Sequence, residues 1–173
     1  MPAAEKTCAP TPGVFEAVAP APAGTPSSAR LGPGMELKPT KRNLAAARVG
    51  KPLVVTGKVR SEDCAPLGGA TINVWQTNGK GRYGPRAGGG DRCCYLQATI
   101  RTEADGSYGL GTVMPKGYAG GPPHIHVTAG HPDAEGLLTE LIFGPEGSPD
   151  VVAMPLRDVE DGRAELDIVL KRS

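Results

Sequence analysis

From residue 49 onward the chain contains short stretches in which apolar and polar residues alternate, separated by turn signals such as Ala104-Asp105-Gly106. Alternation with a period of two is typical of strands that bury one face. The pattern predicts seven strands, at residues 53–60, 70–76, 96–101, 108–113, 124–128, 137–143 and 164–170. Because few helical patterns accompany them, we expect an all-β protein folded as an antiparallel β-sandwich.

The N-terminal part of the chain has a different composition. Residues 9–35 are dense in Pro, Ala, Gly and Ser and show little periodic apolar pattern, which favours an extended arm over a folded unit. We therefore divide the chain into an extended N-terminal arm at 1–48 and a β-sandwich domain at 49–173. Two alternatives stay open for the arm: it wraps a neighbouring subunit, or it is disordered.

Length and charge narrow the classes of function. The 173 residues suffice for one domain with a buried core. The net charge is +1 and the basic residues are scattered, so we expect neither nucleic acid nor an anionic membrane as a partner. No apolar run approaches the roughly 18 to 20 residues that span a bilayer, and no signal-peptide pattern opens the chain, so we expect a cytoplasmic protein.

Four cysteines are present, at positions 8, 64, 93 and 94, and none forms a C-x-x-C zinc pattern. Cys93 and Cys94 are adjacent, so in an extended segment they face opposite sides and rarely pair with each other. The simplest interpretation is that the cysteines are small, buried apolar side chains. A bridge from Cys64 to Cys93 or Cys94 is the alternative that the sequence leaves open.

The run PPHIH at 122–126 is the strongest indication of chemistry in the chain. In a strand, residues i and i+2 share a face, so His124 and His126 point to the same side, and imidazole is a ligand for Fe, Cu, Zn or Ni. Only one further histidine, His131, exists. Two tyrosines in glycine-bounded contexts, Tyr83 and Tyr118, are candidate ligands as phenolates. An H-x-H motif alone is weak evidence for a metal site, so the tyrosines matter.

These residues belong to a longer series of motifs in fixed order: CAPLGGA at 64–70, VWQ at 74–76, GRY at 81–83, DG-x-Y at 105–108, T-x-x-P-x-x-Y at 112–118 and PPHIH at 122–126. The series resembles that of the intradiol ring-cleavage dioxygenases, and most of all their compact, protocatechuate-dioxygenase-like branch. The resemblance covers residues 50–143. The chain lacks the long helical N-terminal dimerisation segment of catechol 1,2-dioxygenases.

The resemblance implies an enzyme of aromatic compound metabolism that cleaves a catechol with O₂ to a muconate-type product. It implies a non-haem Fe(III) held by Tyr83, Tyr118, His124 and His126, with the metal acting as Lewis acid and template. Two phenolates and one hydroxide would neutralise a trivalent ion while the imidazoles stay neutral. Deprotonating two phenols at pH 7 costs about 8 kcal/mol, which is within what protein metal sites can supply.

Tyr118 is the catalytic tyrosine that this resemblance implies, since the matching phenolate leaves the metal when substrate binds. Only five residues separate it from His124, a shorter connection than in better-known members, and Tyr95 is the spare phenol. Two further departures concern charge. Gly121 stands where members commonly carry an arginine, and Glu140, our second catalytic candidate, where they carry glutamine.

Losing a positive charge and gaining a negative one would disfavour a carboxylated catechol such as protocatechuate, provided that Glu140 faces the site. Whether Arg82, Arg86 or Lys116 replaces the missing cation stays open. The competing hypothesis is a non-catalytic metal- or ligand-binding β-sandwich derived from this family. A transthyretin-like or adhesive sandwich would explain the strands but not the Tyr and His residues. By analogy with the family we also expect a homo-oligomer.

Overall fold

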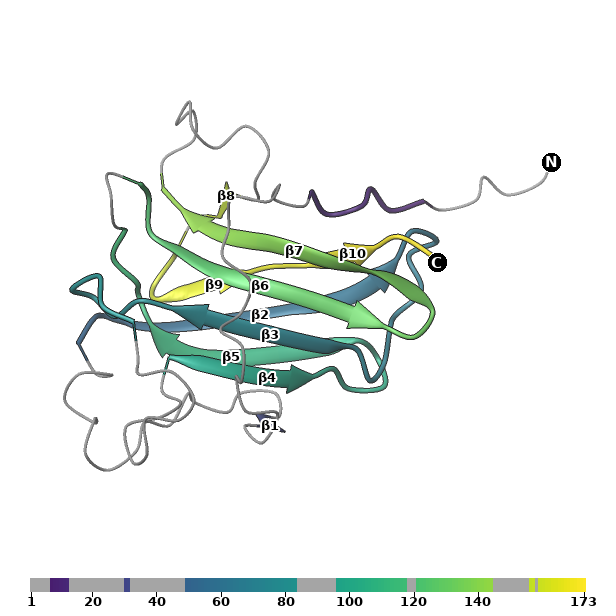
Figure 1. Cartoon of the computed structure of the whole chain (residues 1–173), viewed down its shortest axis with the longest axis horizontal. Helices are drawn as coiled ribbons and strands as arrows, with labels where there is room; N and C mark the ends of the chain where they lie inside the picture. The colour runs from purple at the N-terminus through teal and green to yellow at the C-terminus, as the bar shows by residue number, and fades with distance from the viewer. Residues whose placement is uncertain are drawn as a thin grey trace.

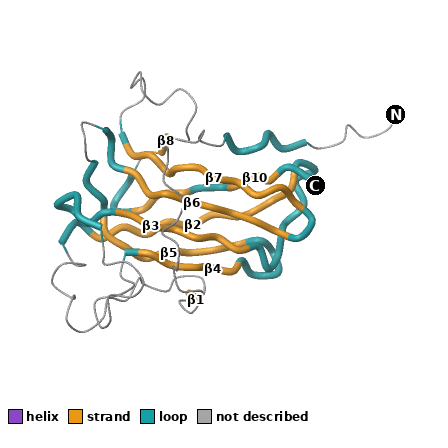
Figure 2. Tube along the Cα trace, viewed as in Figure 1, coloured by secondary structure: helices purple, strands orange, loops and turns teal. Residues whose placement is uncertain are grey.

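Among the residues that the structure describes, ten strands form two sheets and none is helical (Figures 1 and 2). The computed structural model describes residues 7–12, 30–31, 49–83, 96–117, 121–144, 156–157 and 159–173. The strands are β1 Arg30–Leu31, β2 Pro52–Ser61, β3 Thr71–Gln76, β4 Gln97–Arg101, β5 Ser107–Val113, β6 His124–His131, β7 Ala134–Phe143, β8 Leu156–Arg157, β9 Arg163–Glu165 and β10 Ile168–Leu170. All seven predicted strands are present.

The larger sheet has the order β1-β4-β3-β6-β7-β8, and the smaller sheet has the order β10-β2-β5 with β9 also paired to β2. The pairs β2–β5, β3–β4, β3–β6 and β6–β7 are antiparallel, which confirms the predicted antiparallel sandwich. Parallel pairs occur at the remaining positions, where β1, β8, β9 and β10 join their neighbours. The sequence did not indicate these parallel pairs, because they join segments that no short turn connects.

The core lies between the two sheets, and the period of two decides which residues enter it. On β6, Ile125 and Val127 are buried in the core cluster, whereas their neighbours His124 and His126 project from the opposite face of the same sheet. Tyr108 is a core residue: it is 4% exposed and its hydroxyl donates to the Leu166 carbonyl at 2.6 Å.

The predicted strand 164–170 is divided into β9 and β10 by a local interruption at Leu166 and Asp167. The Asp167 carboxylate accepts the Lys58 amide hydrogen at 2.8 Å, so a side chain takes the place of a backbone acceptor there. Gly57 packs against the same point, since a Cβ at position 57 would lie 1.8 Å from the Leu166 carbonyl oxygen. The two segments keep one register on β2, with Glu165 opposite Thr56 and Ile168 opposite Val59.

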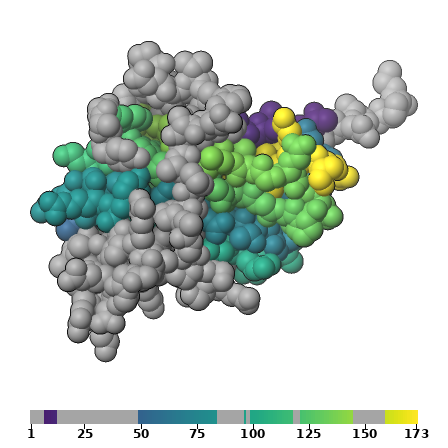
Figure 3. Space-filling model, in the orientation of Figure 1, coloured from purple at the N-terminus to yellow at the C-terminus, as the bar shows by residue number. Residues whose placement is uncertain are grey.

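Two pieces of the arm lie on the sandwich of their own chain. Residues 30–31 pair with β4, and residues 7–12 lie beside β10 and β7 (Figures 1 and 3). The Thr11 amide donates to the Val169 carbonyl at 3.0 Å, and the Thr139 hydroxyl donates to the Pro12 carbonyl at 2.8 Å. The rest of the arm lies outside the described residues.

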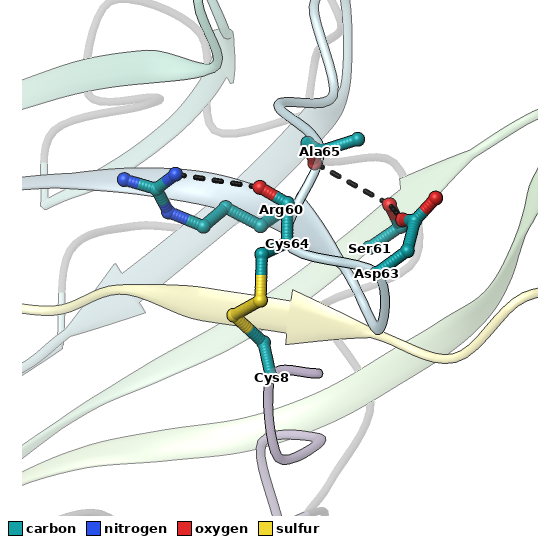
Figure 4. The surroundings of a disulfide bond; sticks show 6 residues. All are labelled: Cys8, Arg60, Ser61, Asp63, Cys64 and Ala65. Atoms are coloured by element: carbon teal, nitrogen blue, oxygen red, sulfur yellow. Dashed lines mark hydrogen bonds between the residues drawn. A yellow bond between two sulfur atoms is a disulfide. The ribbon is translucent and has the colours of Figure 1, made fainter. Parts of the chain in front are cut away.

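A disulfide joins Cys8 to Cys64 (Figure 4). The interpretation of Cys8 and Cys64 as small, buried apolar side chains is therefore wrong, and the open alternative of a bridge from Cys64 to Cys93 or Cys94 is wrong as well. The physical reason is the path of residues 7–12: the Cys8 amide donates to the Glu62 carbonyl at 2.7 Å, which brings Cys8 to the turn that carries Cys64. Cys93 and Cys94 lie outside the described residues.

No helix among the described residues is long and apolar enough to cross a bilayer.

Candidate metal centre

The two histidines of the PPHIH run lie together on the outward face of β6, as predicted. Their ring centroids are 4.7 Å apart and the ring planes are almost perpendicular, at 87°. His126 is 5% exposed, and Trp75, its register partner on β3, stacks on it with centroids 4.9 Å apart and planes at 12°. The Trp75 indole therefore defines the plane in which the His126 imidazole lies.

An oxygen lies beside the Nδ1 atom of each histidine. The Pro122 carbonyl oxygen lies 2.8 Å from Nδ1 of His124, and a carboxylate oxygen of Glu140 lies 3.1 Å from Nδ1 of His126. The second contact has ion-pair distance, although no hydrogen bond of regular geometry forms at His126 Nδ1. An acceptor at Nδ1 favours a proton on that nitrogen and places the lone pair on Nε2.

Tyr83 reaches this pair from the loop that follows β3. Its hydroxyl lies 2.9 Å from Nε2 of His126, and its side chain is 43% exposed. Asn78 shapes the loop, since its side-chain oxygen accepts the amide hydrogens of Lys80 at 2.8 Å and Arg82 at 3.1 Å. Gly81 has φ +79°, a conformation that glycine adopts without strain. The loop sequence thus holds the phenol at the end of the sheet where the histidines lie.

The same loop is tied to the segment that leads toward Tyr118. The Thr77 hydroxyl donates to the Lys116 carbonyl at 2.8 Å, and Gln76 donates to the Val113 carbonyl at 2.7 Å across the sandwich. Tyr118 itself, like the spare phenol Tyr95, lies outside the described residues, so its role as a ligand stays a prediction.

Glu140 faces the site, as the alternation along its strand allows. It is the register partner of His126 on β7 and is 7% exposed. Burial acts to raise the pKa of its carboxyl, but the contact with His126 and the neighbouring His124 together outweigh burial and hold the pKa below its usual value. No lysine or arginine contributes to this shift among the described residues. Arg82 and Lys116, two of the candidate replacement cations, have exposed side chains.

The donor atoms brought together here fit a metal ion. Nitrogen or oxygen atoms of His124, His126 and Glu140 lie within 4.8 Å of one another. The Tyr83 hydroxyl is a further donor at the Nε2 edge of His126, whereas Glu140 lies at the Nδ1 edge. The Tyr83 oxygen and His126 Nε2 lie close together, so a cation that binds both atoms could replace the hydroxyl proton. A mixed imidazole and oxygen set of this kind suits iron, among other transition metals. His131 is not part of the set, since its Nε2 lies 3.2 Å from the Gly68 carbonyl.

Reasoning from the sequence missed what Trp75, Gln76 and Asn78 do. In the sequence Trp75 and Gln76 stand out only as part of the VWQ motif, and Asn78 belongs to none of the motifs. Trp75 could be assigned to the site only from the register of β3 on β6, which the sequence does not provide. Asn78 carried a weak signal, because Asn next to Gly is typical of tight turns.

A family model described as "Dioxygenase" matches residues 30–159. Over 118 residues the chain is 32% identical to catechol 1,2-dioxygenase 1 of Acinetobacter lwoffii. The chain belongs to the intradiol dioxygenase family. The resemblance inferred from its motifs is thereby confirmed. The match covers 57% of this chain and 37% of the Acinetobacter protein. The chain therefore spans less than half the length of that relative.

Other members of the intradiol dioxygenase family give the same result. The chain is 29% identical to the protocatechuate 3,4-dioxygenase beta chain of Burkholderia cepacia, with 71% of this chain and 66% of that one covered. Its fold matches the dioxygenase domain of a dioxygenase and carbohydrate-binding protein fusion from Streptomyces sp. SirexAA-E, with a TM-score of 0.69 and 28% identity. That comparison covers 95% of this chain and all of the Streptomyces domain.

Proposed function

We propose that the protein is a non-haem Fe(III) intradiol dioxygenase that cleaves a catechol with O₂ to a muconate-type dicarboxylate. The observation that carries the proposal is the convergence of the Tyr83 oxygen on Nε2 of His126, beside His124, in a member of this family. Tyr83, His124, His126 and Tyr118 would hold the iron. When bound, it would supply a Lewis acid that withdraws electron density from the catechol ring.

The residues themselves would position and exchange protons. Tyr83 would stay a phenolate, and the two imidazoles would stay neutral with their Nδ1 protons facing the Pro122 carbonyl and Glu140. Tyr118, in the role of the displaced phenolate, would take a proton from the catechol hydroxyl. Trp75 would keep the His126 ring from rotating while these changes occur. The product would receive both atoms of O₂.

The charge of the site predicts its choice of substrate. Glu140 is a buried carboxylate, and its pKa is lowered, so it is negative at neutral pH. A second negative charge about 10 Å away costs about 1.7 kcal/mol at an effective dielectric constant of about 20. Catechol and an aminocatechol should therefore be cleaved faster than protocatechuate, by about 10-fold or more. The Glu140→Gln variant should narrow this difference, and a wild-type preference for protocatechuate would contradict the reasoning.

Metal analysis and a visible spectrum test the proposal directly. The purified protein should contain iron and absorb in the visible through phenolate-to-iron charge transfer, and the band should move to longer wavelength when catechol is added without O₂. Tyr83→Phe should weaken the band and lower the iron content. Tyr108→Phe is the matched control, because it also removes one phenol but lies in the core, where its hydroxyl donates to Leu166. A colourless, iron-free protein from iron-replete cells would refute the proposal.

The alternative, a binding protein without catalysis, makes a different prediction in the same assay. Such a protein would hold iron and shift its band on adding catechol, yet it would consume no O₂ and form no ring-opened product. The homo-oligomer expected from the family stays a prediction, and sedimentation analysis of the full chain tests it.

We also propose that the protein works in an oxidising compartment rather than in the cytoplasm. The disulfide between Cys8 and Cys64 supports this, because disulfides persist in oxidising surroundings and are rare in the cytosol. Alkylation of the native protein from its own source, followed by mass spectrometry, should find both thiols protected. Free Cys8 and Cys64 in that material would refute the proposal.

A further inference from the structure

Glu140 is not among the residues proposed to hold the iron, yet it is one of the few buried charged groups among the described residues. Its strand places it directly opposite His126, and a carboxylate oxygen lies 3.1 Å from His126 Nδ1. Burying a carboxylate is unfavourable unless polar partners offset the lost hydration. The polar group beside the carboxylate here is the His126 imidazole of the candidate metal centre, with Nδ1 at 3.1 Å.

Besides His124, three neighbours contact the His126 ring, and each constrains a different degree of freedom. Trp75 stacks on the face of the ring, at an interplanar angle of 12°. The Tyr83 hydroxyl lies 2.9 Å from Nε2, and Glu140 lies beside Nδ1. The two nitrogens are on different edges of the imidazole, so Glu140 and Tyr83 contact the ring from different directions.

We propose that Glu140 is a positioning residue that accepts the Nδ1 proton of His126, holds the imidazole in one tautomer and leaves Nε2 free to bind the metal beside Tyr83. The Pro122 carbonyl provides the same arrangement for His124, at 2.8 Å from its Nδ1. Carboxylate partners of this kind orient metal-binding histidines and raise their basicity. This inference rests on the function proposed above only for the identity of the metal, since the tautomer belongs to the apo protein.

A different role is open to a carboxylate so close to two histidines, namely direct ligation of the metal. His124, His126 and Glu140 have donor atoms within 4.8 Å of one another, and two histidines with one carboxylate are a known iron-binding set. That arrangement would require a metal on the Nδ1 edge of His126, away from the Tyr83 hydroxyl. The two roles therefore predict different behaviour of the Glu140→Gln variant.

Nitrogen-15 NMR of the apo protein reads the tautomer, and the chain's three histidines keep the spectrum simple. In the wild type His126 should carry its proton on Nδ1. Glu140→Gln should keep this tautomer, because an amide oxygen also accepts a hydrogen bond, whereas Glu140→Leu should lose it. Titration of the apo proteins with Co²⁺ should show affinity within about 5-fold of wild type for Gln and a loss of about 10- to 100-fold for Leu.

Glu135→Gln is the matched control. It removes the same charge from the same strand, but Glu135 is exposed and lies at the far end of β7, so tautomer and Co²⁺ affinity should both stay as in the wild type. Glu140→Ala is measured beside Glu140→Leu, so that a folding defect of one apolar variant leaves the comparison with Gln intact.

Two results would overturn the inference. If Glu140→Gln loses Co²⁺ as completely as Glu140→Leu while the tautomer is unchanged, Glu140 is a direct ligand. If the apolar variants keep both the tautomer and the affinity, the contact has no role. The proposed function can fail independently of this inference, because the His126 tautomer can be measured in the apo form of a protein that takes up no iron.

Discussion

Removing the bond between Cys8 and Cys64 should lower the stability of the folded chain by about 4 kcal/mol. The bond joins residues 56 apart in sequence, and the loss of loop entropy on closing a loop of that length corresponds to about 4 kcal/mol at 25 °C. Without the bond, residues 7–12 would be held by hydrogen bonds such as those from Thr11 and Thr139. These contacts would then have to offset the conformational entropy lost when the segment is ordered.

Urea unfolding followed by tryptophan fluorescence measures this effect, because Trp75 is the chain's single tryptophan and is buried. With a slope of about 2 kcal/mol per molar urea, the midpoint of Cys8→Ser/Cys64→Ser should fall by about 2 M. Wild-type protein with a reductant should fall by the same amount. The double variant should not respond to the reductant, which controls for effects on other thiols. A double variant within about 1 kcal/mol of the oxidised wild type would refute the reasoning.

Three further substitutions test the packing and charge of the sandwich. Gly57→Ala should destabilise the fold by about 3 kcal/mol or more in urea unfolding, because its Cβ would lie 1.8 Å from the Leu166 carbonyl oxygen; a smaller loss than about 1 kcal/mol would show that the strands can separate there. Tyr108→Phe should cost about 1 kcal/mol by loss of its hydrogen bond to Leu166, and an unchanged free energy of unfolding would count against that bond. Hydrogen bonds from Ser107 hold the pKa of Asp105 below 3.8, so its carboxylate stabilises the fold above about pH 4 and this contribution is lost as the pH falls through the lowered pKa. Asp105→Asn should make the free energy of unfolding less dependent on pH in that range, and an identical pH profile would exclude the effect.

The strands were predictable because alternation is a local property of the sequence. Each predicted segment formed a strand, and the shared face of His124 and His126 followed from the same period of two. The orientation of Glu140 could be stated only conditionally, because the face that a strand buries depends on its register with a neighbour. Its contact with His126 depends on the pairing of β6 with β7, which the structure provides.

Long-range pairings were the part that the sequence did not specify. The sequence leaves open a bridge from Cys64 to Cys93 or Cys94, whereas the partner in the structure is Cys8, in the N-terminal arm. That segment is attached by individual hydrogen bonds to Glu62 and Val169, which the amino-acid composition does not indicate. The division of the last predicted strand had a similar cause, since it depends on the side chain of Asp167 meeting the amide of Lys58.

Along β6, the residues that fold the protein and those proposed to perform its chemistry occupy alternate positions. Ile125 and Val127 belong to the core cluster, while His124 and His126 do not. The donor set can therefore be redesigned, for example toward another metal or another aromatic substrate, with the hydrophobic interior left untouched. This separation makes the domain a suitable starting scaffold for directed evolution.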